Sequence, residues 1–599
     1  MSTEPATTHD DIELAPGDWT LVRKLAPYLR PDALLYVVAF VLAPVSAALT
    51  VVQPLLLKTV IDDYVVPGNL NGLQTAALLY LAAVVAAFAT EASYTVALSH
   101  AASRTIARLR DRIYQHSLSL AQSFFDRVPT GRLLTRATSD VDALGETLTA
   151  GAITIVLDML LVVGILVGMF ALDAKLTLVL LLVGPPLALA IELIRRKLRN
   201  LYNIVRTSLA ELNAYLAERL NGVQVVQLYA DEERALRGFD ERLYRYRDAT
   251  VSTNIWDALM YALVDGLANV TMALMLWYGS GGILEGVATA GLLAAFIDYI
   301  GKLFQPVREF SAKVAIIQRA TSALEKIFGL LDHREQIPDG TQPLEGELES
   351  VVLEDVSFAY GEGPDVLRGV SLEVRPGEVV ALVGRTGSGK STIGKLLIRA
   401  YQGYRGSIRI NGRELSELQR DAVRRMIGMV HQDVVLFPGD VRFNVALGAD
   451  IPDAELEEAI RIVHAQRAIE RLGGLDGRVE HGGRNLSVGE GQLLAFARTM
   501  AHDPPMVILD EATASVDTLT EAAIQQATEA VLARKTVLVI AHRLSTIIHA
   551  DRIVVMEAGQ VVEVGSHAEL LERGGRYADL FQKQFGEELE DDDRELSAG

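Results

Sequence analysis

Six long apolar stretches limit what this chain can fold into. The run from Ala33 to Leu57 contains no charged residue and is long enough to cross a bilayer as a tilted helix. Composition agrees, since 50% of the residues are hydrophobic although only 6% are aromatic. The predicted spans cover residues 33–57, 64–90 (with a loop at 67–72 before the helix begins), 147–172, 176–191, 258–284 and 286–304. We therefore expect a membrane domain of six helices.

Basic residues are distributed unevenly between these spans. Lys and Arg gather after the second and fourth predicted spans, whereas the opposite loops carry little more than Lys58 and Lys175. Because basic loops stay on the cytoplasmic side of a membrane, both termini are predicted to be cytoplasmic. The basic residues are Arg104, Arg108, Arg110, Arg112, Arg127, Arg132 and Arg136 in the first group, and Arg195, Arg196, Lys197, Arg199 and Arg206 in the second.

The segments outside the spans also show helical patterns. Residues 19–29 place apolar side chains opposite Arg23 and Lys24, which favours a helix lying in the membrane interface over a polar lead-in. The charged segments after the second and fourth spans predict helices that continue into the cytoplasm. Two short breaks, Phe124–Gly131 and Gly222–Glu232, are predicted to be tips where the membrane domain presses on a cytoplasmic partner.

Acidic residues at membrane depth need an explanation, because an unpaired charge is costly to bury in lipid. Asp158, Asp265 and Asp298 are the candidates, with Glu91 near the end of a span. Asp298 and Lys302 are one helical turn apart and can pair. Two hypotheses stay open for Asp158 and Asp265. They line a water-filled cavity that favours cationic cargo, or they form structural pairs or lie nearer the cytoplasm than the predicted span limits suggest.

Beyond a linker that contains Pro and Gly, short apolar runs alternate with helical segments. A buried run at residues 379–383 leads at once into a glycine-rich loop and a helix, which predicts a phosphate-binding loop. Its glycines allow backbone N–H groups to face phosphates at a helix N-terminus. Lys390 supplies a charge for the terminal phosphates, and Ser391 offers a hydroxyl to Mg²⁺. The predicted nucleotide contacts are Gly384, Arg385, Thr386, Gly387, Ser388, Gly389, Lys390, Ser391 and Thr392.

A second buried run, residues 506–509, ends in two carboxylates. Asp510 can reach the Mg²⁺ shell, and Glu511 is placed where a general base for the attacking water is needed. A surface turn is the alternative reading, which the four apolar residues before Asp510 disfavour.

Between these runs lies Leu486-Ser487-Val488-Gly489-Glu490, which resembles the signature motif of ATP-binding-cassette transporters. The resemblance covers the chain from about Trp19 to Phe585, in the order of an exporter half-transporter. It implies a multi-domain protein of the type I exporter fold, with an all-α six-helix transmembrane domain followed by an α/β P-loop nucleotide-binding domain. It also implies an ATPase that uses ATP and Mg²⁺ and works as a head-to-tail dimer with two ATP molecules between the subunits.

The resemblance assigns roles to single residues. Tyr360 matches the aromatic residue that stacks on adenine, and Gln432 matches the glutamine that contacts Mg²⁺ and couples catalysis to the membrane domain. His542 matches the histidine that holds the γ-phosphate. Asp517 lies in the loop that crosses the dimer interface. Glu511, His542 and Gln432 are therefore the expected catalytic residues, while Ser391, Gln432 and Asp510 are the expected metal site.

The signature departs from the usual pattern, which reads Leu-Ser-Gly-Gly-Gln. Val488 and Glu490 replace its first glycine and its glutamine. Ser487 and Gly489 would still touch the nucleotide that the partner's phosphate loop holds. An imperfect signature on a chain with an intact Glu511 is similar to one member of the heterodimeric exporters. We therefore expect a second half-transporter as partner, and a heterodimer rather than a homodimer.

Composition excludes some other classes. The formal charge of −20 argues against nucleic acid as a partner, and the lack of cysteine excludes disulfides and thiolate metal sites. The predicted function is ATP-driven export of amphipathic or lipophilic compounds across the cytoplasmic membrane, in contact with membrane lipids. The alternatives are a lipid flippase or importer of the same fold, and an ATP-gated channel or regulatory subunit. The predicted domains are a disordered tail (1–18), the transmembrane domain (19–335), a linker (336–348), the nucleotide-binding domain (349–586) and an acidic tail (587–599).

Overall fold

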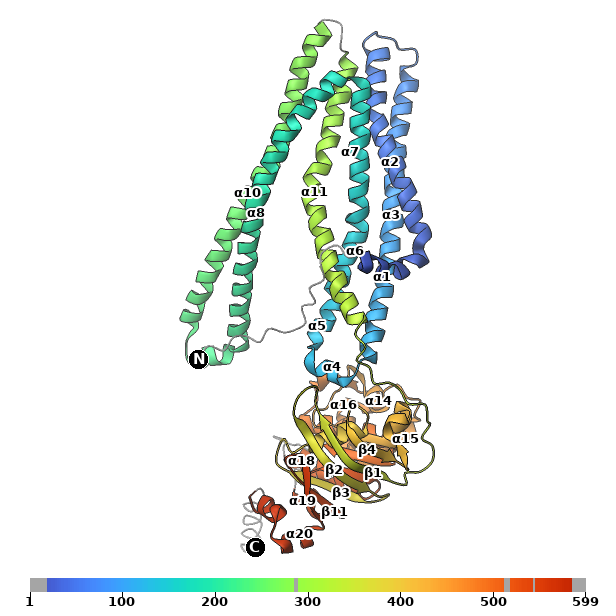
Figure 1. Ribbon diagram of the computed structural model, residues 1–599, viewed down its shortest axis with the longest axis vertical. Helices are drawn as coiled ribbons and strands as arrows, with labels where there is room; N and C mark the ends of the chain where they lie inside the picture. Colours follow the sequence, from blue (N-terminus) through green and yellow to red (C-terminus); the bar gives the residue numbers. More distant parts are fainter. Residues whose placement is uncertain (1–18, 285–288, 511–517, 542–543, 584–599) are drawn as a thin grey trace. The chain divides into compact units, whose positions relative to one another are not determined.

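The computed structural model describes residues 19–284, 289–510, 518–541 and 544–583 (Figure 1). The chain divides into two compact units. The first unit comprises residues 1–118 and 131–333, and the second comprises residues 119–130 and 334–599. A short segment enclosed by the first unit in the sequence therefore packs with the second. The two predicted tails, 1–18 and 587–599, lie outside the described residues.

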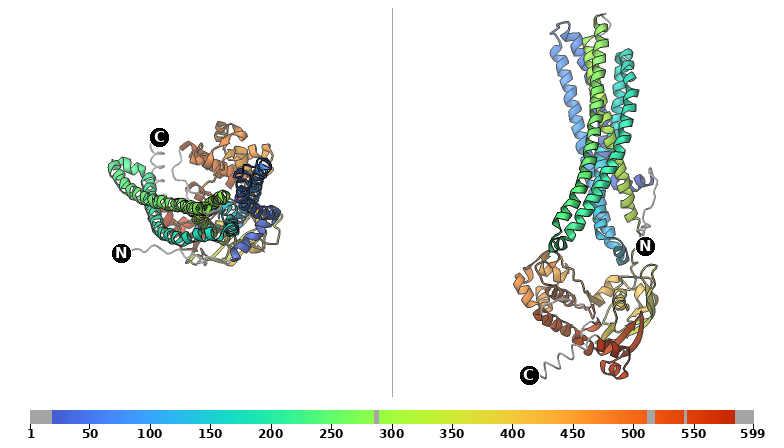
Figure 2. Two further views of the ribbon diagram at one scale, coloured as in Figure 1. Left: turned by 90° about the horizontal axis from the view of Figure 1, so that it is seen from above. Right: turned by 90° about the vertical axis from the view of Figure 1, so that its left-hand side faces the viewer.

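The first unit is built from helices. The longest are α3, α8 and α10, with 47, 48 and 53 residues. Helices α8 and α10 run side by side along most of their length (Figures 1 and 2). The helices are α1 (Trp19–Leu29), α2 (Ala33–Val60), α3 (Leu73–Ser119), α5 (Thr130–Thr135), α6 (Val141–Ala150), α7 (Ala152–Leu172), α8 (Ala174–Asn221), α9 (Val223–Leu228), α10 (Glu232–Leu284) and α11 (Ala290–Leu331).

The predicted spans lie in six of these helices: α2, α3, α7, α8, α10 and α11. Four helical segments of the described chain are long and apolar enough to cross a membrane, and they are Thr20–Val65, Leu73–Ser119, Thr130–Leu172 and Glu232–Trp277. The fourth and sixth predicted spans lie on α8 and α11, which the same length and hydropathy criterion does not select among the described residues. Residues 286–288 of the sixth predicted span lie outside them.

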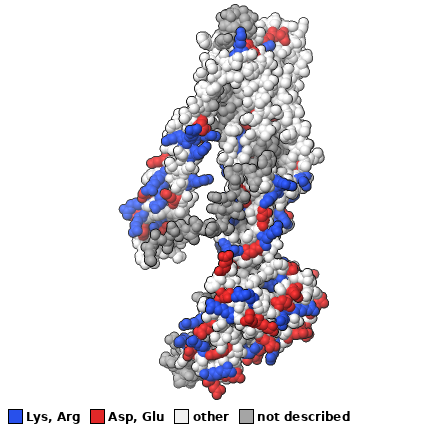
Figure 3. Space-filling model, in the orientation of Figure 1, with Lys and Arg blue, Asp and Glu red and all other residues white. Residues whose placement is uncertain are grey.

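The predicted loop before the second span and the break at Gly222–Glu232 are confirmed, whereas most of the break predicted at Phe124–Gly131 is helical, in α4 (Gln122–Arg127) and at the start of α5. Helix α1 has the bounds expected for the interfacial helix, and α3 begins at Leu73 after a turn at residues 66–68. Helix α8 ends at Asn221 with Gly222 as its cap, and α10 starts at Glu232. Charged side chains gather on the lower part of α8 and α10 in the view of Figure 3 and are sparse over the upper part of the first unit. This distribution is the one expected of helices that leave a hydrocarbon layer.

The core of the first unit joins α2, α7 and α11. Phe296, Tyr299 and Ile300 of α11 are fully buried there, together with Ile165 and Met169 of α7. The Tyr299 hydroxyl donates a hydrogen bond of 2.7 Å to the Val51 carbonyl of α2 and lies next to Gly168 of α7, so three helices meet at one side chain. Such a contact satisfies the tyrosine hydroxyl inside an apolar bundle.

The second unit is an α/β fold whose described residues form two main sheets and a two-stranded ribbon of β7 and β8. The larger has the strand order β12-β11-β3-β10-β9-β6, in which only β12 is antiparallel to its neighbour. The smaller is antiparallel, with the order β2-β1-β4-β5. The strands are β1 (Val351–Ala359), β2 (Asp365–Val374), β3 (Val379–Gly384), β4 (Arg405–Ile410), β5 (Arg413–Glu414), β6 (Ile427–Val430), β7 (Gly439–Asp440), β8 (Arg478–Val479), β9 (Met506–Asp510), β10 (Thr536–Ile540), β11 (Arg552–Glu557) and β12 (Gln560–Gly565).

One face of the larger sheet packs against helices and the other against helices and the antiparallel sheet, so its central strands are largely apolar. Val507 and Leu509 of β9 face one buried cluster, while Met506 and Ile508 face the other. This alternation explains why residues 506–509 form a continuous apolar run. The helices are α4 (Gln122–Arg127), α12 (Lys390–Leu397), α13 (Arg420–Met426), α14 (Val441–Ala446), α15 (Asp453–Ile462), α16 (Gln466–Leu472), α17 (Val488–Ala501), α18 (Thr518–Leu532), α19 (Leu544–Ile548) and α20 (His567–Arg573).

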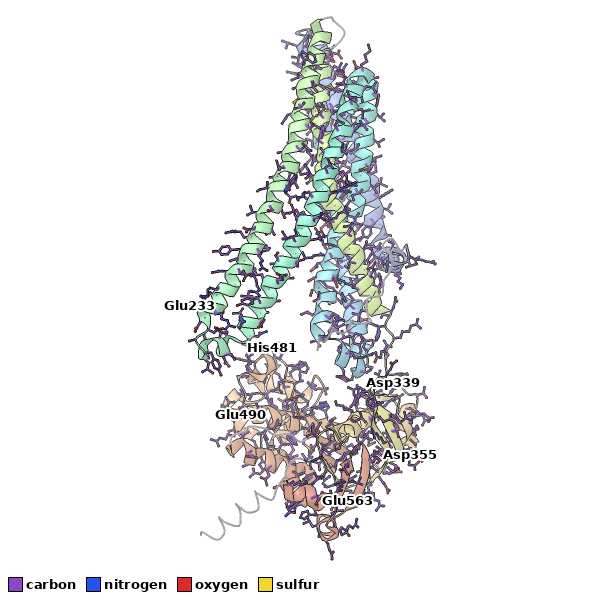
Figure 4. The ribbon with its side chains drawn as sticks, turned by 60° about the vertical axis from the view of Figure 1, so that its left-hand side comes forward. Glu233, Asp339, Asp355, His481, Glu490 and Glu563 are labelled. Atoms are coloured by element: carbon purple, nitrogen blue, oxygen red, sulfur yellow. The ribbon has the colours of Figure 1, made fainter. Side chains whose placement is uncertain are left out.

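The segment predicted to be a linker packs on the second unit. Leu344 and Leu348 are buried in one of its cores, and Arg399 donates a hydrogen bond of 2.9 Å to the Pro338 carbonyl. The Asp339 carboxylate accepts from the Arg420 backbone N–H at 2.7 Å and lies at the edge of the unit (Figure 4). Residues 337–348 are thus held by the nucleotide-binding half of the sequence.

We predict that Gly168→Ala destabilises the first unit. A Cβ at this position would lie 2.8 Å from the Tyr299 hydroxyl, and the fully buried Tyr299 cannot move away without losing its bond to Val51. Overpacking of this kind costs about 1–3 kcal/mol. The thermal unfolding temperature of the detergent-solubilised chain should fall. Gly266→Ala is the control, because nothing lies within 4 Å of its added Cβ. Equal unfolding temperatures for the two variants would contradict the prediction.

Candidate functional site

The predicted phosphate loop joins β3 to α12. Gly389 caps α12 with a φ of 99°, a backbone conformation that glycine adopts without strain. A Cβ at Gly384 would lie 2.2 Å from the Met556 carbonyl oxygen of β11, so this position also requires glycine. Arg385, Thr386 and Gly387 are exposed on the outer part of the loop. The sequence 384–391 therefore folds as a strand, a tight loop and a helix N-terminus, as its pattern predicts.

Two side chains of the loop fit an anion. The Ser388 hydroxyl is buried and has no hydrogen-bond partner among the described residues. Lys390 is only 5% exposed, and its Nζ donates to the carbonyls of Gly384 (2.6 Å) and Arg385 (3.2 Å). Burial lowers the pKa of the Lys390 ammonium, and the Asp510 carboxylate opposes that shift. A phosphate group would satisfy the Ser388 hydroxyl and give Lys390 a charged partner.

Hydroxyl and carboxylate oxygens meet next to this loop. Ser391 Oγ lies 3.3 Å from Asp510 Oδ1, at the end of β9. The parallel pairing of Val430 with Leu509 places Gln432, which follows β6, at the same edge of the sheet. Hard oxygen ligands of this kind fit Mg²⁺, which Ser391, Asp510 and Gln432 would hold. A bound Mg²⁺ would neutralise charge on the phosphates.

Tyr360 comes directly after β1. Its ring packs edge to face against Phe358 (centroids 5.0 Å apart, 83°) and against Tyr401 (5.0 Å, 88°). Its hydroxyl is 3.0 Å from the Thr392 hydroxyl, so Tyr360 is tied to the first turn of α12. The structure therefore brings Tyr360, the phosphate loop and Asp510 together within one unit.

The signature segment forms the N-terminus of α17. The Ser487 hydroxyl accepts from the Glu490 backbone N–H at 3.2 Å, while the Glu490 carboxylate accepts from the Ser487 N–H at 2.8 Å. This reciprocal cap fixes the start of the helix. Arg471 of α16 adds a 2.6 Å ion pair to Glu490. Gly489 is buried, and the Val488 side chain is 67% exposed.

The signature does not join the phosphate loop of its own chain. Within the described residues, no hydrogen bond links Ser487 or Gly489 to residues 384–391. Glu490 and His481 lie on the helical side of the unit, away from Asp355 on the antiparallel sheet (Figure 4). Glu511, Asp517 and His542 lie outside the described residues, so their expected roles stay predictions.

Comparison with known proteins identifies the family. Residues 36–307 match the family of ABC transporter transmembrane regions, and residues 367–514 match the ABC transporter family. The chain is 31% identical over 591 residues to the ABC transporter ATP-binding protein YknV of Bacillus subtilis, covering 97% of each chain. The chain belongs to the ATP-binding-cassette transporters. The helical unit contains the transmembrane region and the α/β unit contains the ATPase domain of an ATPase coupled to transport across a membrane.

Other relatives of this ABC half-transporter carry more specific names. It is 34% identical over 577 residues to the ATP-dependent lipid A-core flippase of Chromohalobacter salexigens, which covers 95% of this chain and 99% of that one. It is 35% identical over 570 residues to the multidrug efflux ATP-binding/permease protein Rv0194 of Mycobacterium tuberculosis. That match covers 94% of this chain and 47% of Rv0194. The half-transporter is therefore of the exporter type.

Several contacts around the site were not predicted from the sequence. Arg471, the partner of Glu490, precedes the signature by 15 residues, and no local pattern connects the two positions. Tyr401 is buried beside Tyr360 although the chain between them spans the whole phosphate loop. Glu335, placed at the end of the membrane domain by the sequence, instead accepts a 2.5 Å bond from Ser123 within the second unit. Only three-dimensional packing reveals these contacts.

Proposed function

We propose that this half-transporter exports amphipathic or lipophilic compounds across the cytoplasmic membrane by alternating access. ATP binding would draw two nucleotide-binding domains together, and hydrolysis through Glu511 would separate them. His542 and Asp517 would contribute to the same composite site. The observation that carries this proposal is a polar cavity inside the helical unit, because an export pump needs a place for its cargo within the membrane.

The cavity has a volume of about 330 Å³. It is lined by α2, α3, α7 and α11, and its polar side chains include two ammonium groups and three carboxylates. Lys313 bridges Asp158 (2.5 Å) and Glu309 (3.0 Å). Its charged lining residues are Glu91, Asp158, Lys302, Glu309 and Lys313.

The acidic residues predicted at membrane depth fit both hypotheses in part, since one of them lines the cavity and is also paired. Asp298 pairs with Lys302 at 2.9 Å, as its spacing predicts. Asp158 lines the cavity and is also paired, with Lys313. Asp265 lies on α10 and is absent from the cavity lining, so its role stays a prediction. With carboxylates in excess over ammonium groups, the cavity favours cargo that carries a positive charge.

Lipid transfer is the second candidate. The similarity to a lipid A-core flippase favours it, since that relative covers nearly the whole chain. Transport measured in both inside-out and right-side-out vesicles separates the candidates. Export accumulates a soluble amphiphile in inside-out vesicles, whereas a flippase moves a labelled lipid between leaflets without filling the lumen.

We further propose that the partner is a second, different half-transporter. The Glu490 carboxylate stands in the signature where a neutral glutamine is usual, and only 19% of its side chain is exposed. Facing the partner's nucleotide, this charge would repel a phosphate, and Arg471 would only partly offset the repulsion. Such a signature suits a composite site with weak turnover, while Glu511 would serve the second, active site.

The first test is ATP turnover by the chain purified alone in lipid. We expect negligible turnover that rises when the second half-transporter is co-expressed and is abolished by Glu511→Gln. The physical reason is that a phosphate loop needs a competent signature from the other subunit. Robust turnover by the chain alone, abolished by Glu511→Gln, would instead show a working homodimer.

A second prediction concerns the signature charge. Glu490→Gln keeps an oxygen that accepts from the Ser487 N–H, so the helix cap survives, but the negative charge is lost. ATP turnover at the composite site to which this signature contributes should rise roughly threefold to tenfold, as expected when about 1 kcal/mol of repulsion is removed. Glu470→Gln, an exposed carboxylate next to Arg471, is the matched control. Unchanged or lower turnover for Glu490→Gln would contradict the proposed repulsion.

A third prediction concerns the cargo. Asp158→Asn should weaken the stimulation of ATPase activity by a long-chain quaternary ammonium compound roughly tenfold, because it removes a cavity carboxylate. Stimulation by a neutral amphiphile of the same chain length should change little. Asp63→Asn alters an exposed carboxylate outside the cavity and serves as the control. Equal losses for the charged and neutral compounds would assign Asp158 a purely structural role through Lys313.

A further inference from the structure

A short segment of the membrane half is held by the second unit. It consists of residues 119–130 with helix α4, hereafter the tip. Its Ala121 N–H donates to the Glu335 carbonyl at 2.9 Å, and Phe124 is 6% exposed. The tip follows α3 directly in the chain, so any displacement of the tip is passed covalently to a helix of the membrane domain.

Tyr401 connects the tip to the nucleotide site. It is 6% exposed, and its hydroxyl donates to the Asp126 carboxylate of the tip. Burial and the Asp126 carboxylate raise the pKa of Tyr401, so the hydroxyl stays protonated and remains a donor. Removing Asp126 would leave a buried hydroxyl without its acceptor, which is costly.

The ring of Tyr401 packs against residues near the nucleotide site. Its centroid is 5.0 Å from that of Tyr360 and 6.0 Å from that of Phe358, and Lys395 of α12 lies 6.0 Å from the same ring. Tyr360 is in turn bound to Thr392, next to the phosphate loop. Close-packed aromatic rings cannot shift singly, because each edge-to-face contact fixes the orientation of its neighbour.

We propose that Tyr401 is a positioning residue that couples the occupancy of the adenine platform, Tyr360, to the tip through Asp126. This inference rests on the proposed role of Tyr360 in stacking on adenine. The hydroxyl of Tyr401 anchors the ring from the tip, and the ring holds Tyr360 ready for the base. Since coupling is reciprocal, the tip contact must strengthen ATP binding by the same factor by which ATP strengthens the tip contact.

The test is a double-mutant cycle on the full-length chain in lipid nanodiscs, read by the Kd of a non-hydrolysable ATP analogue. Asp126→Ala and Tyr401→Phe should each weaken binding by about threefold or more, and the double variant should be no weaker than either. Tyr404→Phe is the matched control, since that partly buried hydroxyl donates to Glu414 at 2.9 Å, outside the tip. It should leave the Kd unchanged. Additive effects in the double variant would overturn the coupling.

A second ligand separates coupling from damage to the loop. Inorganic tripolyphosphate can occupy the phosphate loop but has no base for Tyr360. Its Kd should be the same in all four proteins of the cycle. Equal weakening of tripolyphosphate and of the ATP analogue would mean a distorted loop and would overturn the proposal.

Tyr360→Ala distinguishes failure of the platform from failure of the coupling. Weaker binding of the ATP analogue with unchanged tripolyphosphate binding supports the platform. If that result accompanies an additive cycle, the coupling alone is wrong. If Tyr360→Ala leaves both affinities unchanged, the platform is wrong and the coupling falls with it.

The chain contains no cysteine, so a single introduced cysteine can carry a fluorescent label that reports on the tip. A single Gln122→Cys variant labelled with an environment-sensitive dye places a probe on an exposed position of α4. The ATP analogue should change its emission in the otherwise native chain and not in the Tyr401→Phe background. The same emission change in both proteins would overturn the proposal, because the signal would then bypass the Tyr401 hydroxyl.

Discussion

A peptide group in hydrocarbon finds no water, so each backbone N–H and C=O within a span must be satisfied by the chain itself. The first unit meets this demand with continuous helices. Helices α3, α8 and α10 contain 47, 48 and 53 residues, whereas a bilayer needs only about 20. The surplus turns carry the basic side chains. A helix is stiff over such lengths, and motion at one of its ends is therefore transmitted along it.

The nucleotide site depends on the opposite property of a helix, its unsatisfied first N–H groups. Helix α12 begins at Lys390, and its N-terminus opens on the glycine-rich loop. Among the described residues, the Ser388 hydroxyl of the loop is buried without a partner, and the Lys390 ammonium donates to backbone carbonyls. Both groups are better satisfied by phosphate than by the protein. Binding energy from the phosphates is thus available to reorganise what is packed against α12, including Tyr360 through Thr392.

Most helices and strands could be predicted from the sequence, because their bounds depend on residues that are neighbours in the chain. The bounds of α1 and the breaks after Asn221 and before Leu73 follow from apolar periodicity and from Pro and Gly positions. The strand, loop and helix around Lys390 follow from residues adjacent in the chain. Contacts between distant residues could not be predicted in this way. Asp126 and Tyr401 are 275 residues apart, and Asp158 and Lys313 are 155 apart. Their pairing depends on how separate elements pack against each other, and hydrophobic periodicity within one segment carries no information about that packing.

Glu490 illustrates how one substitution can satisfy the fold and still affect the chemistry. As a helix cap it is as good as glutamine, because either side chain accepts from the Ser487 N–H. Its charge also attracts Arg471, which ties α16 to the start of α17. The carboxylate also weakens the attraction of this helix N-terminus for a phosphate, because it neutralises the partial positive charge that would otherwise face an anion. Stability of the subunit and phosphate binding across the dimer therefore make opposite demands on this position. Under the proposed heterodimer, a chain that keeps the carboxylate gains a well-fixed signature helix at the expense of turnover in the composite site to which that helix would contribute.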